Sequence, residues 1–170
     1  MEGTLKLQLE LIPERQWHLS LARLLPKEIW DALRREIYQK FSYTCCICDT
    51  TNCRVNCHEV WLFDDKRRIQ YLKGLQCLDD DCHMVKHWGR TVAETLKGNY
   101  PADTIDRLTR HFCEVNQCTP EAFELHKVEA GELWLKRSRY DYRIDFGLFK
   151  IETIVKTYKD QLQYNKKSRR

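Results

Sequence analysis

The 170-residue sequence lacks several features that define whole classes of protein. It has no uninterrupted apolar run of about 18 residues, which excludes a membrane-spanning helix. Its first residues lack the basic start and the continuous apolar core of a secretory signal peptide. No internal repeat and no low-complexity segment is visible. These absences predict a cytoplasmic protein with no membrane partner, and the length of 170 residues predicts a single domain over residues 1–170.

A strong net charge is missing as well. The sequence has 29 basic and 25 acidic residues and a formal net charge of +4, which is too mild to identify a polyanionic partner. Basic residues do form local clusters, namely "KRR" at 66–68, "KRSR" at 136–139 and a basic tail at 164–170. Such clusters favour a nucleic-acid partner, although a basic chain end is more often a solvated tail.

Alternating apolar residues predict two half-buried strands, in "TLKLQLEL" (residues 4–11) and in "RYDYRIDF" (residues 139–146). We expect these strands to pair with each other, because each has one apolar face that needs a partner. Two apolar runs near the middle of the chain, residues 54–63 and 69–78, predict a β-hairpin.

Helical spacings and cap residues predict most of the remaining elements. Pro26 suits the first turn of one helix, and Thr119 followed by Pro120 suits the start of another. Acidic residues suit a helix N-terminus, so a further helix is expected to begin near Asp79 or Asp80. The predicted helices are therefore 26–41, a helix starting near 79–80, 102–115, 119–137 and 149–164.

Nine cysteines are present, and most lie in "YTCCICDTTNCRVNCHEVWLFDD" and "LKGLQCLDDDCHMVKHWGR". Without a sign of export they are expected to be metal ligands and reduced thiols and not disulfides. Cys45-x-x-Cys48 has a zinc-knuckle spacing, in which two thiolates on a tight turn reach one ion at about 2.3 Å each. A second ligand pair roughly thirty residues later strengthens this prediction.

The second ligand pair is irregular. Cys82 is expected just inside a helix N-terminus, but the residue three positions earlier is Asp79 instead of a cysteine. Cys77 is the alternative partner. Aspartate is a permitted zinc ligand, whereas zinc prefers thiolate when both are available. Ligand chemistry thus favours Cys77, and spacing narrowly favours a structural Zn²⁺ site of Cys45, Cys48, Asp79 and Cys82.

Residues 43–90 resemble the HNH nuclease motif of the His-Me finger (ββα-metal) superfamily, in its zinc-bearing form. The likeness rests on C-x2-C, on "CHEVW" and on "LKGLQ…DDDCHMVKH", and the flanks look like those of microbial and phage proteins of HNH type. It implies an α+β fold with a zinc-stabilised ββα-metal centre at 43–90. Segments 1–42 and 91–163 would then supply flanking helices and a terminal strand pair.

The resemblance also implies site residues. His58 matches the general base that deprotonates a water to attack a phosphodiester of DNA. His83 matches the helix histidine that holds a catalytic Mg²⁺ or Mn²⁺, and His87, one helical turn later, shares its face. Glu59 is a candidate oxygen ligand or acid, although neighbours on a strand point to opposite faces.

The sequence departs from the HNH pattern in three places. The central Asn, which orients the base, is expected near Lys73 or Gly74, and neither residue can replace it. Cys57 and Glu59 stand beside His58 where an acid or second histidine is usual, and Asp79 replaces a zinc cysteine. As an alternative to catalysis, His58 could bond a backbone carbonyl or support a zinc ligand from outside the coordination shell. His83 has an alternative reading as the fourth zinc ligand, which would leave Asp79 only as a helix cap.

Three functions follow from these patterns. The favoured one is an HNH-like metal-dependent endonuclease. The alternatives are a catalytically degenerate zinc module that binds nucleic acid, and a protein inhibitor or accessory subunit of a nucleic-acid machine.

Overall fold

The computed structural model describes residues 5–147, which form an α+β fold with one small sheet and six α-helices. Strands β1 (Val55–Asp64) and β2 (Ile69–Asp79) make a long antiparallel hairpin, and β3 (Arg143–Asp145) pairs in parallel with the start of β2. A 3-10 helix spans Glu14–Gln16. The α-helices are α1 (Leu21–Leu24), α2 (Lys27–Lys40), α3 (Asp80–Lys86), α4 (Trp88–Leu96), α5 (Thr104–Asn116) and α6 (Pro120–Ser138).

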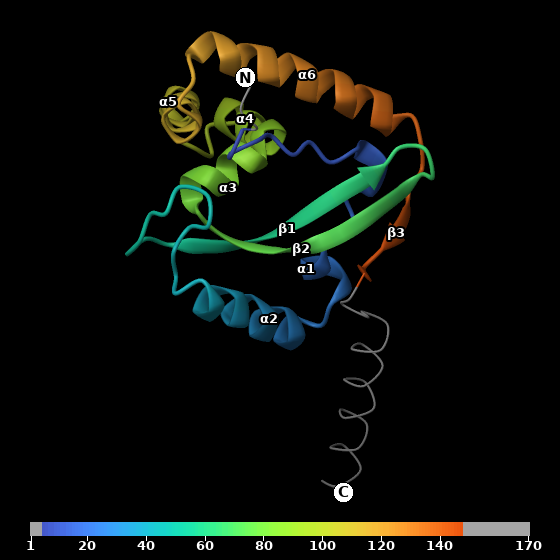
Figure 1. The fold of residues 1–170 in the computed structure, drawn as a ribbon. Coiled ribbons are helices and arrows are strands. Elements are labelled where there is room, and N and C mark those ends of the chain that lie inside the picture. The colour runs from blue at the N-terminus through green and yellow to red at the C-terminus, as the bar shows by residue number, and fades with distance from the viewer. Residues whose placement is uncertain (1–4, 148–170) are drawn as a thin grey trace, which may run out of the picture.

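The hairpin lies between two groups of helices, with α1 and α2 on one side and α3 to α6 on the other (Figure 1). Each side has its own buried apolar cluster. The larger cluster joins the N-terminal segment, α3, α5 and α6, and its buried members are Leu7, Leu9, Cys45, Leu78, Cys82, Val85, Trp88, Leu108, Phe112 and Phe123. The smaller cluster lies under α1 and is made of Leu21, Leu25, Leu72 and Leu75, with α2 side chains packed against it.

Several predicted elements are confirmed. The hairpin forms with His58 opposite Gln76, and α3 begins at Asp80 with Asp79 as its N-cap. Helix α6 begins at Pro120, and the Thr119 hydroxyl accepts a hydrogen bond from the Ala122 amide at 3.4 Å. Helices α2 and α5 also form as predicted, except that Pro26 is the N-cap of α2 and does not lie in its first turn.

The predicted N-terminal strand is wrong for the described part, residues 5–11, and so is the terminal strand pair. The segment is extended and buries Leu7 and Leu9, as the alternating pattern indicates, but it joins no sheet. Strand β3 pairs instead with Ile69–Tyr71 of β2.

Side chains and single backbone contacts take the place of the missing strand partner. The Asn116 side chain bonds both the amide and the carbonyl of Leu7, at 3.0 and 2.9 Å. His126 Nε2 accepts from the Leu9 amide at 3.0 Å, and the Glu10 amide donates to the Lys86 carbonyl at 3.0 Å. These bonds replace a strand ladder for the backbone groups of Leu7, Leu9 and Glu10 that they involve.

A break at His87 separates α3 from α4, and the sequence analysis did not anticipate it. The Thr91 hydroxyl donates to the Met84 carbonyl at 2.8 Å, which compensates one of the carbonyls at the end of α3. The predicted helix at 149–164 and the basic tail lie outside the described residues. Within residues 5–147, no helix combines the length and apolar character needed to cross a bilayer.

Candidate metal centres

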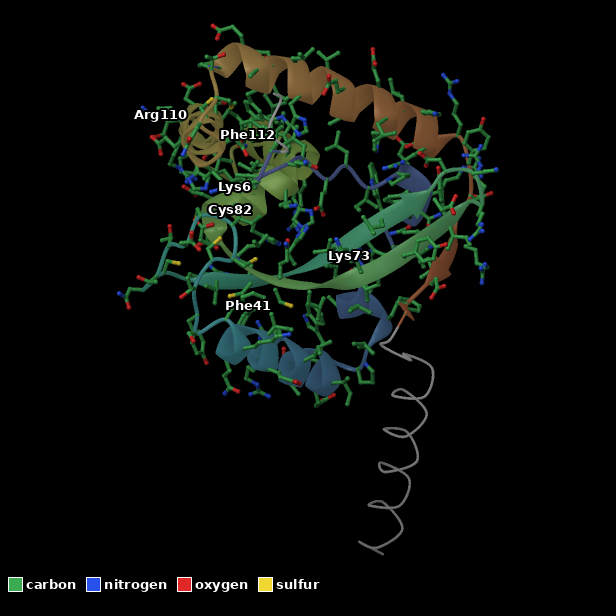
Figure 2. The ribbon with its side chains drawn as sticks, in the orientation of Figure 1. Lys6, Phe41, Lys73, Cys82, Arg110 and Phe112 are labelled. Carbon is green, nitrogen blue, oxygen red and sulfur yellow. The ribbon has the colours of Figure 1, made fainter. Side chains whose placement is uncertain are left out.

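The junction of β2 and α3 positions the first cluster of ligand atoms. The Asp79 carboxylate accepts a hydrogen bond from the Cys82 amide at 3.0 Å, which fixes the first turn of α3. Asp80 and Asp81 lie in the same turn, where the helix dipole favours acidic groups. Cys82 consequently lies at the end of the hairpin, far along the sheet from Lys73 (Figure 2).

The four ligands that the spacing predicted come together. One ligand atom each from Cys45, Cys48, Asp79 and Cys82 lies within 4.8 Å of every other, and three of these residues are buried. The Cys46 amide donates to the Cys77 carbonyl at 2.9 Å, so the loop that contains Cys45 and Cys48 is fastened to β2. This group could hold a metal ion and is compatible with structural zinc.

Cys77, the alternative ligand, lies outside this group. It is fully buried on β2 opposite Cys57, and burial raises its pKa to about 11. Its sulfur is not among the ligand atoms that lie within 4.8 Å of one another. The structure therefore favours Asp79, the choice made from spacing, over Cys77.

The electrostatics of the cysteine cluster suit a cation. A hydrogen bond from the Cys82 thiol, opposed by burial, lowers the pKa of Cys45 to about 6. Burial alone would raise the pKa of Asp79, but the hydrogen bonds that its carboxylate accepts from Cys82 have the larger effect, and the pKa is lowered. The cluster thus already contains a carboxylate and a readily ionised thiol at neutral pH.

His111 of α5 contacts this cluster, which the sequence did not reveal. Its Nε2 lies 3.1 Å from Cys82 Sγ. An imidazole N–H beside a ligand thiolate stabilises the charge on sulfur and ties α5 to the cluster. No local spacing signals this contact, because 29 residues separate the two side chains.

Substituting Asp79 separates its two roles. Asparagine is as good an N-cap as aspartate but a weaker zinc ligand, so Asp79→Asn is expected to lower zinc affinity while α3 stays capped. Asp79→Ala should lose both, with about 1 kcal/mol of additional destabilisation from the cap. Chelator competition and zinc content by mass spectrometry measure the first effect. Unchanged zinc affinity in Asp79→Asn would make Asp79 a cap only.

A second cluster forms where β1 faces α3. One ring nitrogen each from His58, His83 and His87 lies within 4.8 Å of the others. The His58 ring centroid is 5.6 Å from that of His83 and 4.9 Å from that of His87, and the rings meet edge to face. Since His83 and His87 are one turn apart on α3, both reach the strand histidine.

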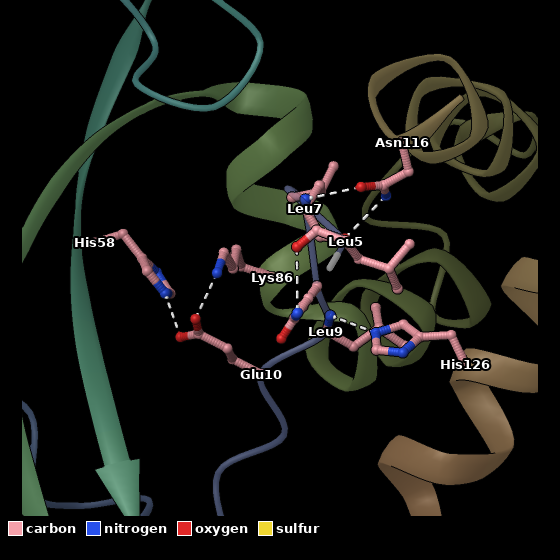
Figure 3. Close-up of polar contacts among 9 residues, drawn as sticks. Leu5, Leu7, Leu9, Glu10, His58, Lys86, Asn116 and His126 are labelled. Carbon is pink, nitrogen blue, oxygen red and sulfur yellow. Dashed lines mark hydrogen bonds and ion pairs between the residues drawn. The ribbon is translucent and has the colours of Figure 1, made fainter. Parts of the chain in front are cut away.

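Glu10 and Lys86 complete the surroundings of His58. The Glu10 carboxylate lies between them, 2.8 Å from His58 Nε2 and 2.5 Å from Lys86 Nζ (Figure 3). Burial alone would raise the pKa of Glu10, but the contacts with His58 and Lys86 together have the larger effect. The pKa is lowered, so the carboxylate is ionised at neutral pH. In the neutral form of the His58 ring, the ionised Glu10 accepts the Nε2–H, and Nδ1 is then the acceptor nitrogen.

The free nitrogen of His58 is the clearest sign of an additional bound group. The side chain is only 3% exposed, and the buried Nδ1 atom has no hydrogen-bond partner among the described residues. Burial lowers the pKa of His83 to about 4 and that of His87 to about 3. The two helix rings are therefore neutral at pH 7 and offer lone pairs, as a metal site requires.

Glu59, a candidate for the same site, is not part of it. Its carboxylate accepts from the Leu21 amide at 2.8 Å and from Trp61 Nε1 at 3.0 Å, which places it towards α1. Burial raises the Glu59 pKa. The physical reason is strand alternation, which sends the side chains of His58 and Glu59 to opposite faces of the sheet.

Two of the three basic clusters meet at the β1–β2 turn. The Arg137 guanidinium contacts both oxygens of Asp65, at 2.9 and 3.2 Å. The Arg68 guanidinium lies 3.4 Å from the centroid of the Tyr140 ring. These contacts hold the end of α6 and the segment before β3 against the turn. The exposed basic residues gathered here are called the turn patch, and they are Lys66, Arg67, Lys136 and Arg143.

Comparison of the chain with protein-family models, with curated proteins and with solved structures found no match.

Proposed function

We propose that the chain is a metal-dependent endonuclease of the HNH type that hydrolyses phosphodiester bonds in DNA. One observation supports this above all: a strand histidine and two helix histidines converge in a hairpin that runs directly into a helix. That order is the one the HNH resemblance implies. In this function His58 is the general base, and His83 and His87 hold the catalytic ion.

Glu10 takes over the task of the missing central Asn. In HNH nucleases that residue orients the base, and the expected positions here, Lys73 and Gly74, cannot do so. Glu10 instead approaches from the N-terminal segment and holds His58 Nε2 at 2.8 Å. A base whose far nitrogen is held by a carboxylate presents its other nitrogen in a fixed direction, as in catalytic triads.

Lys86 makes a buried carboxylate at this position tolerable. Its side chain is 7% exposed and its ammonium pairs with Glu10 at 2.5 Å, so the two charges compensate each other. The pair adds no net charge beside the ion that His83 and His87 would hold. Arg90, which is exposed, adds a positive potential at both rings and favours an approaching phosphate.

The donor set indicates which ion the centre would take. Imidazole nitrogens suit Mn²⁺ and other transition ions better than Mg²⁺, which prefers oxygen ligands. Such an ion, when bound, supplies Lewis-acid stabilisation of the charge on the scissile phosphate and on the leaving oxygen. We therefore expect cleavage to be faster with Mn²⁺ than with Mg²⁺ at equal concentration. The cysteine cluster holds a separate structural Zn²⁺ in this proposal.

The turn patch supports DNA as the substrate. Asp64 lies six positions after His58 on β1, a distance of about 20 Å along the strand. A duplex is long enough to span this distance, so one bound duplex would place phosphates near both the histidine cluster and the turn patch. Lysine and arginine contacts of this kind position a duplex without reading its sequence.

The turn patch also supports the second candidate, a zinc module that binds DNA without cutting it. In that case substitution of the turn patch should weaken binding, whereas substitution of His58 should change nothing. Binding should also weaken as salt rises, since each phosphate contact releases counterions.

The proposed role of Glu10 is tested by two double variants that also remove the Lys86 charge. Glu10→Gln with Lys86→Met retains an oxygen acceptor for His58, whereas Glu10→Ala with Lys86→Met does not. We expect the alanine version to lower kcat about 100-fold more than the glutamine version, because a misplaced base loses its reaction geometry. KM for DNA and metal content should stay equal in both.

Steady-state cleavage of a fluorescent duplex, with melting curves on the same samples, measures these effects. A purely structural Glu10 would lower the melting temperature and kcat of the two double variants in parallel. Equal kcat in two folded double variants would exclude an orienting role for Glu10.

A further inference from the structure

Helix α6 exposes an apolar side to solvent. The helix lies along the outside of the molecule (Figure 1). Phe123 on its inner side is fully buried in the larger core cluster, whereas Leu125, Val128 and Leu135 are 61%, 58% and 56% exposed. Leucine and valine so exposed on one helix form a patch that needs an explanation.

The exposed side has the spacing of a coiled-coil seam. Its positions follow one another at alternating intervals of four and three residues, as the a and d positions of a heptad repeat do. Its six positions are Glu121, Leu125, Val128, Glu132, Leu135 and Arg139, and all six are exposed. Such a repeat faces a second helix in coiled coils.

The seam is complementary to itself when it is reversed. In an antiparallel pair of α6 helices centred on residue 130, each a position meets a d position of the other copy. Leu125 then lies opposite Leu135 of the second copy, Val128 opposite Glu132, and Glu121 opposite Arg139. The acidic start of each seam therefore meets the basic end of the other.

We propose that α6 is the dimerisation surface of this protein and that its partner is a second, antiparallel copy of the same helix. A parallel pair is disfavoured, because it would place Glu121 beside Glu121 and Arg139 beside Arg139. Self-complementarity under a two-fold axis is the property that an isologous homodimer interface requires. Pairing with an unrelated partner would not explain why Glu121 and Arg139, which have opposite charges, lie at equal distances from residue 130.

The expected dimer is reversible. A 19-residue helix is about 28 Å long, so a pair of them buries an area at the small end of specific interfaces. Glu132 opposite Val128 weakens the middle of the seam. Dimer formation should thus depend on protein concentration in the micromolar range, and Glu132→Leu should tighten it.

Sedimentation equilibrium of the full chain between about 1 and 200 µM tests the proposal. Wild type should change from the mass of one chain to that of two. Arg139→Glu should raise the dissociation constant about 10-fold, and Glu121→Arg combined with Arg139→Glu should restore it, because the pairs reform with reversed signs. Leu96→Ser is the matched control, since Leu96 is 83% exposed on α4, and it should change nothing.

Two outcomes would overturn the dimer. A single-chain mass at every concentration would mean that α6 does not pair with a second copy of itself. Failure of the charge-swapped double variant to restore dimerisation would exclude the antiparallel register.

Discussion

Replacing His58 by alanine is expected to abolish the proposed DNA cleavage while the protein keeps its fold and the ions proposed for the two clusters. General-base catalysis contributes about 10²–10⁴-fold to rate, and the loss should appear in kcat. Both metals should stay, because the ligands of the proposed Zn²⁺ and the two helix histidines are untouched. The measurement is single-turnover cleavage of a duplex, with zinc and manganese content determined on the same preparation.

His18→Ala is the matched control, since His18 is exposed and belongs to neither cluster. Its rate should equal that of wild type. If His58→Ala loses the manganese ion together with activity, His58 is a third ligand of that ion and not the base. If alanine destabilises this buried position, His58→Asn fills part of the space and tests the same point.

Removal of Cys82, a ligand of the proposed structural Zn²⁺, is expected to have the largest effect on stability. Structural zinc contributes about 10 kcal/mol or more of binding energy, which is comparable with the whole stability of a domain. The Cys82 side chain is fully buried where α3, the Cys45–Cys48 loop and His111 meet. Cys82→Ser should therefore lose zinc and the cooperative unfolding transition of the hairpin and α3.

Thermal melting followed by circular dichroism, with a chelator and then with added zinc, measures this effect. Wild type should lose stability with the chelator and recover it with zinc, because only the folded state has the site. Cys118→Ser is the control, since Cys118 lies outside both metal clusters. A Cys82→Ser protein that melts like wild type, with one zinc per chain, would contradict the structural role.

Local patterns in the sequence predicted the parts of the site that depend on short distances along the chain. The knuckle spacing of Cys45 and Cys48 and the cap position of Asp79 are set by turns and helix starts. The one-turn spacing of His83 and His87 is equally local. Each needs only a few residues of backbone in a standard conformation, so the structure brings these residues together as predicted.

Contacts between segments that are far apart in the sequence could not be predicted from local patterns. Glu10 reaches His58 across 48 residues, and His111 reaches Cys82 across 29. The N-terminal segment was predicted as a strand because its alternation shows burial correctly. Alternation cannot show whether a ladder or the side chains of Asn116 and His126 will bond the backbone.

The histidine cluster as a hydrolytic centre is tested most directly by nicking of supercoiled plasmid. The zinc-loaded protein, stripped of other divalent ions, is incubated at low salt with Mn²⁺, with Mg²⁺ or with neither, beside His58→Ala and His83→Ala. Nicking is expected for wild type with Mn²⁺, more slowly with Mg²⁺, and for neither variant. Intact plasmid with every divalent ion at high protein concentration, or equal nicking by His58→Ala, would contradict a hydrolytic centre built from these histidines.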